Sequence, residues 1–130
     1  MIEESEIEEY LDQMKQMIRN NRFKIELNQN RVENIKLFQE YLINEENVKS
    51  ILLNLKVNDF CEKVQNKHVG FRHEWLYIFG KEISLLKRYE DEDTIVPLYI
   101  KFNMLENKIL IIVSFHEQKY PLNYYFDEKH

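Results

Sequence analysis

The sequence has very few of the residues that break, bend or cross-link a chain. Its 130 residues include two glycines, two prolines and one cysteine, Cys61. So little glycine and proline argues against a disordered or low-complexity protein. A lone cysteine cannot close an internal disulfide, so a reducing cytoplasm is the expected compartment. The length and the absence of a linker-like stretch predict a single domain over residues 1–130.

Long apolar runs and a basic start are also missing. No apolar stretch approaches the length that crosses a bilayer. The first residues, MIEESE, are acidic, whereas a signal peptide begins with basic residues. We therefore expect no membrane partner.

Positive charge is absent from the first twelve residues and modest elsewhere. Residues 1–12 contain six acidic side chains and no lysine or arginine, and the net charge of the chain is −5. A high-affinity nucleic-acid binder normally has a strongly basic surface, so binding to DNA by the chain on its own is not expected. An enzyme that needs only a local basic cleft is compatible with this charge.

Helical periodicity dominates the first half of the chain. Apolar residues recur every three or four positions in three segments, residues 3–19, 32–42 and 44–55. Each segment has one apolar and one charged face, which predicts three amphipathic helices.

Strand periodicity dominates the second half. The expected strands are residues 22–27, 73–83, 97–104 and 109–115. Gly80 suggests a bend or bulge. We expect residues 85–96 to form a charged connection and residues 106–108 a tight hairpin.

The order of these elements predicts the fold class. Helices followed by an antiparallel sheet give an α+β domain, with N-terminal helices packed on a small sheet. The run ILIIV at residues 109–113 predicts a strand that is buried on both faces and lies in the middle of this sheet, paired with residues 97–103.

The candidate catalytic residues follow from these strands. His116 comes directly after the apolar run, where a rigid strand would hold a proton-transfer group in place. Tyr99 and Lys101 alternate on the polar side of the preceding strand, and Lys81 follows Gly80. Together these four side chains suit cleavage of RNA through the ribose 2′-hydroxyl without a metal ion. The alternative is a surface histidine beside an ordinary solvated sheet face.

Other segments give weaker indications. His68 and His73 have no cysteine or carboxylate cluster near them, so we expect no metal site and no cofactor. Cys61, between Phe60 and Glu62, predicts a packed thiol. The closing YPLNYYF could stack RNA bases or cover an edge of the sheet.

Four blocks in order resemble the MqsR family of toxins from type II toxin–antitoxin systems. They are EWLYIFGKEI (74–83), LYIKF (98–102), ILIIVSFHE (109–117) and YPLNYYF (120–126), and they are preceded by LLNLKVNDF (52–60). The likeness is greatest to the branch found in Gram-positive bacteria. It extends from the first helix to the last residue.

This resemblance implies a RelE-like fold and a metal-independent mRNA endoribonuclease that a cognate antitoxin protein inhibits. The catalytic tyrosine and the lysine of the family's Y-[LI]-K block correspond to Tyr99 and Lys101. The basic residue of its last block corresponds to His116. Lys81 would stabilise charge on the phosphate, and the expected RNA contacts are Arg72, Lys63 and His73.

The chain departs from the family pattern at two positions. Glu62 stands where the enteric members have a lysine, and Leu76 where they have a glutamine. A second hypothesis therefore stays open, in which the chain keeps the scaffold but is a catalytically silent binding protein that acts through its acidic first helix.

Overall fold

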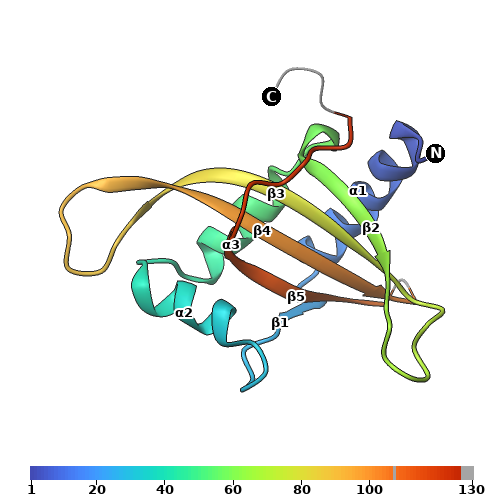
Figure 1. Ribbon diagram of the computed structural model, residues 1–130, viewed down its shortest axis with the longest axis horizontal. Helices are drawn as coiled ribbons and strands as arrows, with labels where there is room; N and C mark the ends of the chain where they lie inside the picture. The colour runs from blue at the N-terminus through green and yellow to red at the C-terminus, as the bar shows by residue number, and fades with distance from the viewer. Residues whose placement is uncertain (107, 127–130) are drawn as a thin grey trace.

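The computed structural model describes residues 1–106 and 108–126 as three helices packed on a sheet of five strands (Figure 1). The helices are α1 (Glu4–Arg19), α2 (Val32–Glu40) and α3 (Glu45–Leu53), followed by the short 3-10 helix η1 (Val57–Asp59). The strands are β1 (Phe23–Ile25), β2 (Phe60–Gln65), β3 (Trp75–Leu86), β4 (Asp93–Leu105) and β5 (Ile109–Glu117). The predicted α+β class is confirmed.

The sheet is mixed. The sequence analysis predicted an antiparallel sheet, and this prediction is wrong for one pair of strands. Its strand order is β1-β5-β4-β3-β2, and β1 runs parallel to β5 while all other neighbours are antiparallel. Apolar alternation marks a segment as a strand but does not give its direction. A short strand between two helices, such as β1, can enter the sheet either way.

Strand β5 is internal and pairs with β4, as predicted, with Ile100 opposite Phe115. The middle strand of the five is β4, however, and not β5. The segment 85–96 is not a simple connection, because β3 and β4 continue into it with Leu86 opposite Asp93. Backbone pairing tolerates exposed charged side chains there. The predicted hairpin at 106–108 includes a residue outside the described part of the chain.

One face of the sheet carries the hydrophobic core. Helices α1 and α3 lie behind the sheet in Figure 1. The apolar stripe of α1, including Met14 and Ile18, packs with sheet residues such as Phe79, Ile100 and Phe102, and all five are fully buried. The helices cover this face because their apolar stripes need a partner. No helix in the described residues is long and apolar enough to cross a membrane.

Helix α2 lies beside the sheet, at the edge of β5 (Figure 1). The Asn34 carboxamide donates to the Val113 carbonyl at 3.0 Å and accepts from the Phe115 amide at 2.8 Å. At the other end of α2, the Arg88 guanidinium donates to the carbonyls of Phe38 and Gln39. The start of α2 is therefore tied to β5, and its end to the turn that follows β3.

Candidate nucleic-acid interface

The sheet face away from α1 and α3 brings together three of the predicted catalytic side chains. Tyr99 is opposite His116 in the β4–β5 register, and Lys101 is opposite Ser114. The rings of Tyr99 and His116 stack, with 5.1 Å between their centroids and 10° between their planes. The Lys101 Nζ lies 5.9 Å from the centroid of the Tyr99 ring.

A β-bulge turns His116 onto this face. Lys101 pairs with Ser114 and Phe102 with Ile112, so Val113 is an extra residue in β5. Without it, strict alternation from the buried Ile112 would direct residue 116 into the helix-covered core. Bulges commonly re-aim side chains in this way, and here the bulge sets His116 beside Tyr99.

The contacts of the imidazole fix its hydrogen-bonding role. The Nδ1 atom lies 2.9 Å from the Glu117 carbonyl oxygen. A carbonyl oxygen can only accept, so Nδ1 carries the proton in the neutral ring and Nε2 has a free lone pair. Nε2 is therefore able to take a proton from a substrate.

Tyr99 and Lys101 are half-buried, and burial changes the pKa of both side chains. Burial, and after it the Glu62 carboxylate, raises the pKa of Tyr99. Burial, and after it the Arg31 guanidinium, lowers the pKa of Lys101, while Glu62 acts in the opposite direction. The phenol stays protonated near neutral pH, and the lysine releases its proton more readily than a solvated one.

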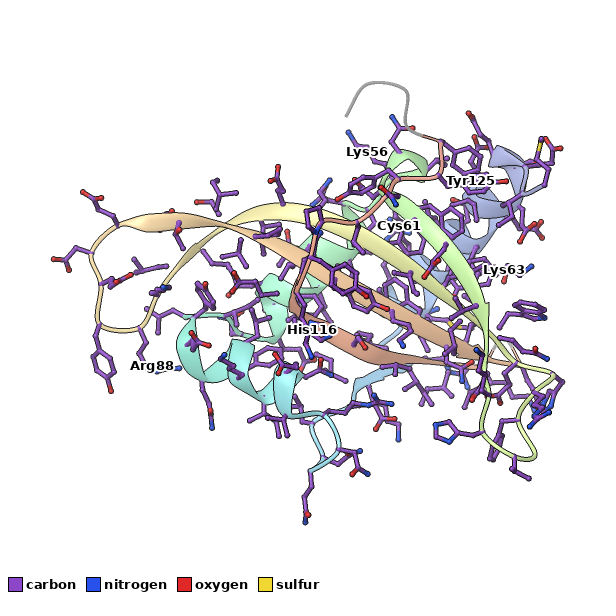
Figure 2. All side chains as sticks on the ribbon, in the orientation of Figure 1. Lys56, Cys61, Lys63, Arg88, His116 and Tyr125 are labelled. Carbon is purple, nitrogen blue, oxygen red and sulfur yellow. The ribbon has the colours of Figure 1, made fainter. Side chains whose placement is uncertain are left out.

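The C-terminal segment, residues 118–126, crosses this open face in front of β4 and β3 (Figure 1). We call it the strap. The Tyr125 amide donates to the Phe60 carbonyl at 3.0 Å, and the Tyr125 hydroxyl accepts from the Ile2 amide at 2.9 Å. In Figure 2, Tyr125 lies at the far end of the strap from His116. The strap therefore crosses a face of the sheet and reaches the edge strand β2 only at Tyr125. The sequence analysis offered cover of a sheet edge as one of its two interpretations, and this contact agrees with it only in part.

The strap and the sheet enclose a small hollow around the histidine, which we call the histidine hollow. Its volume is about 200 Å³. The lining residues are Tyr99, Lys101, Ser114 and His116 from the sheet and Lys119, Tyr120 and Leu122 from the strap. Lys119 thus adds a third basic group that the sequence analysis missed, because no periodicity links it to the strands. Its ammonium also lies 3.9 Å from the Glu33 carboxylate, in an exposed ion pair that water screens.

Gly80 allows the strap to approach the sheet. A Cβ atom at this position would lie 2.6 Å from the Tyr124 hydroxyl and 2.9 Å from the Leu122 Cδ1. Gly80 pairs with Tyr99 inside the regular β3–β4 ladder, so it marks a close packing contact and not the predicted bend or bulge.

A larger hollow adjoins the first and shares Tyr99 and Lys101 with it. We call it the sheet hollow, and its volume is about 660 Å³. Its apolar floor consists of Val64, Leu76, Ile78, Ile111 and Val113. Its charged residues are Glu26, Arg31, Glu62, Lys67 and Lys101, and His68 lines it as well. The apolar run of β5 is thus covered by helices on one face only, which differs from the predicted burial on both faces.

Lys81 does not join the other three predicted catalytic residues. It follows Gly80 in β3, so alternation directs it to the opposite face. Its ammonium lies 3.3 Å from a carboxylate oxygen of Asp59. The structure therefore assigns Lys81 to an ion pair away from His116.

The predicted RNA contacts are also dispersed. Lys63 lies on the helix-covered side, 3.1 Å from Glu6 and over the Trp75 ring (Figure 2). His73 lines a separate cavity with Tyr10 and Trp75. Arg72 is exposed in the β2–β3 loop, and its carbonyl accepts from Gln65. None of these three lines the histidine hollow or the sheet hollow.

The remaining candidate groups are not arranged for chemistry. Cys61 is buried, and burial raises the pKa of its thiol to about 12. A thiol with such a pKa is a poor nucleophile, in agreement with a packed residue. Among the residues that the structure describes, no three His, Cys, Asp or Glu side chains gather into a group that could hold a metal ion.

No protein-family model matches the chain, and neither a curated protein nor a solved structure does. The geometry of the open face is therefore the basis for an assignment of function. It combines a histidine with a free lone pair, a protonated phenol and two or more cations beside a groove with an apolar floor.

Proposed function

We propose that the chain is a metal-independent endoribonuclease whose active centre is the histidine hollow. The observation that carries this proposal is the stacked pair of Tyr99 and His116, with the Lys101 ammonium next to it. Cleavage through the ribose 2′-hydroxyl needs a base, an acid and positive charge at the phosphate. The open face of the sheet supplies one candidate for each.

Each side chain would have its own role in the cleavage reaction. The His116 Nε2 takes the proton of the 2′-hydroxyl, whose oxygen attacks the adjacent phosphorus. Lys101 stabilises the charge on the phosphorane, assisted by Lys119 from the strap. The bond from phosphorus to the 5′-oxygen breaks, and the Tyr99 hydroxyl donates its proton to that oxygen. The products are a 2′,3′-cyclic phosphate and a 5′-hydroxyl end.

The biological role that we propose rests on the family resemblance. A MqsR-like toxin with a RelE-like fold would cleave mRNA in the cytoplasm and would be held inactive by a cognate antitoxin protein. The same three positions, Tyr99, Lys101 and His116, carry both the resemblance and the proposed chemistry. Lys81, paired with Asp59, is left out of the mechanism.

A cleavage assay on purified protein tests the chemistry. We expect the wild type to cleave single-stranded RNA in the presence of EDTA and to leave a 2′,3′-cyclic phosphate. His116→Ala should slow cleavage roughly 10²–10⁴-fold with an almost unchanged melting temperature, because a partly exposed imidazole contributes little packing. Arg19→Gln changes an exposed residue of α1. It is the control variant and should cleave RNA at the wild-type rate.

Two results would contradict the proposal. Cleavage that EDTA abolishes and a divalent ion restores would require a metal site elsewhere. A folded wild-type protein that cleaves no RNA would favour the silent binding protein. Induction in a bacterium, with and without a neighbouring antitoxin reading frame, followed by mapping of transcript 5′ ends, separates a toxin from such a binding protein.

A further inference from the structure

Arg31 and Lys101 face the same sheet hollow, and no carboxylate of the described residues forms an ion pair with either cation. Both side chains are half-buried and line the hollow. No hydrogen bond or ion pair joins the Arg31 guanidinium or the Lys101 ammonium to another described residue. Lys101 has only the Tyr99 ring beside its ammonium, at 5.9 Å from the centroid. Partly desolvated cations without a paired carboxylate are unfavourable, so the two cations indicate a site that an anion completes.

The two cations are close enough to affect one another. Arg31 lowers the pKa of Lys101, which means that their charges repel across the hollow. Repulsion between like charges in a partly buried site destabilises the empty form, and a bound anion relieves it. A phosphate group with a planar face of oxygens suits a guanidinium in particular.

The fold holds Arg31 in position. The Arg31 amide donates to the Asn28 carbonyl at 2.9 Å, and the Arg31 carbonyl accepts from the Ile35 amide at 3.1 Å. One turn further, Asn34 binds the edge of β5. The backbone of Arg31 is therefore fixed to the sheet next to the hollow, even though its sequence position gave no indication of this.

The sheet hollow also contains two carboxylates, Glu26 and Glu62, which do not neutralise all of its positive charge. Glu26 is hydrogen-bonded to the Asn28 side chain at 3.1 Å. Glu62 is on β2, at the opposite edge of the sheet from β1 and α2. The lining of the hollow thus holds three lysine or arginine cations, Arg31, Lys67 and Lys101, against two carboxylates, and this excess favours an anion.

We propose that Arg31 and Lys101 bind a second phosphate of single-stranded RNA, one nucleotide away from the phosphate at His116. The inference rests on the proposed function and adds to it a second phosphate position and the residue Arg31 that binds there. Lys101 lies in both hollows, so it joins the two phosphate positions. The apolar floor around Leu76 and Ile78 accepts the face of an unpaired base, which a duplex would not expose.

Binding to an RNA that cannot be cleaved tests this site without relying on catalysis. The probe is a short, fluorescein-labelled, single-stranded 2′-O-methyl RNA, and Kd is measured by anisotropy over a range of salt concentrations. We expect Arg31→Gln to weaken binding about tenfold and to reduce the slope of log K against log salt by about 0.7, the value for one single-strand phosphate contact. Arg31→Lys should recover part of the affinity. Arg19→Gln, the same charge change on α1, should match the wild type.

The outcomes separate this inference from the proposed function. If the wild type cleaves RNA but Arg31→Gln leaves both Kd and the salt slope unchanged, the phosphate site is wrong and the cleavage proposal stands. If Arg31 is required for binding but no RNA is cleaved, the site stands and the enzyme proposal fails. Equal affinity for a duplex of the same length would overturn the single-strand assignment.

Discussion

The Asn34 side chain accepts a hydrogen bond from the Phe115 amide at 2.8 Å and so extends the edge of the sheet beyond the end of β1. Strand β1 pairs with β5 only as far as Ile25 opposite Ile112. Beyond that point the Asn34 carboxamide forms the hydrogen bonds along β5 in place of a strand. It also donates to the carbonyls of Val113 and Glu26. The residue is 1% exposed and acts as one more rung of the ladder.

Asn34→Ala should therefore be strongly destabilising. It leaves the Phe115 amide and the Val113 carbonyl without partners, and an unsatisfied buried group costs about 1–3 kcal/mol. We expect a loss of roughly 2–4 kcal/mol in urea unfolding with an unchanged m-value. Asn30→Ala, at an exposed position, should stay within about 0.5 kcal/mol of the wild type. Equal stability of the two variants would show that the edge bonds are dispensable.

Gly80→Ala should loosen the strap more than it destabilises the fold. The added methyl group would meet the Tyr124 hydroxyl and Leu122 Cδ1, both at the ends of side chains, so the strap would shift and the strand would stay. Lys119 and Tyr120 then no longer close the histidine hollow. We expect slower RNA cleavage and faster cutting by trypsin after Lys119.

Gly70→Ala is the control for this change. Gly70 has a φ of 89° and open space around its Cα, so alanine there should cost about 1 kcal/mol through backbone strain alone. Trypsin should cut this variant after Lys119 at the wild-type rate. If the two glycine variants are cut equally fast, Gly80 has no special relation to the strap.

The sequence was sufficient to assign the two faces of β4. Alternation over residues 97–104 predicted Leu98 and Ile100 in the core and Tyr99 and Lys101 on the other side, and the structure agrees. The pleat of a strand enforces this period whatever surrounds it. The amphipathic helix α1 was predictable for the same kind of local reason.

The rest of the site depends on tertiary structure. The extra residue Val113 reverses the alternation of β5, and an uninterrupted apolar run gives no sign of where such a bulge lies. Lys81 was expected near His116, but it follows Gly80, and a glycine has no side chain that would show which face of the strand it occupies. The sequence therefore did not show that Lys81 lies on the opposite face. Arg31 precedes α2 and belongs to no periodic pattern, so only the contact of Asn34 with β5 brings it to the sheet hollow.

The charge of Lys101 opposes folding, which gives a prediction on pH. Its pKa is lower in the folded chain than the ordinary 10.5, because of burial and then Arg31. The unfolded chain therefore binds more protons between the lowered pKa and 10.5, and the stability of the wild type rises with pH through this window. At neutral pH Lys101 is charged in both states and its desolvation is a fixed penalty.

Lys101→Met should accordingly raise the melting temperature near neutral pH and lower RNA cleavage. The gain in stability should shrink as the pH rises toward 10.5, because the folded lysine loses its proton in this window while the unfolded one still keeps much of its own, and it should vanish above 10.5, where the lysine is neutral in both states. Thermal unfolding of both proteins at about pH 7 and about pH 10 measures this difference. A destabilised Lys101→Met at neutral pH would mean that the ammonium has a favourable partner in the folded chain.

Glu62 should weaken RNA binding, and removing its charge should strengthen it. The carboxylate is exposed, lies in the sheet hollow and acts on the titration of both Tyr99 and Lys101. It therefore repels a phosphate chain in the same hollow. We expect Glu62→Gln to lower Kd for the 2′-O-methyl RNA about two- to fivefold, and Glu62→Lys to lower it further, with both effects fading at high salt.

Glu8→Gln makes the same charge change on the exposed side of α1, away from the hollow, and should leave Kd almost unchanged. The comparison removes any effect of net charge alone, since both variants lose one negative charge. Weaker binding by Glu62→Gln would reverse the interpretation, because it would mean that the carboxylate accepts hydrogen bonds from a base. In that case Glu62 would select the base that lies on the apolar floor.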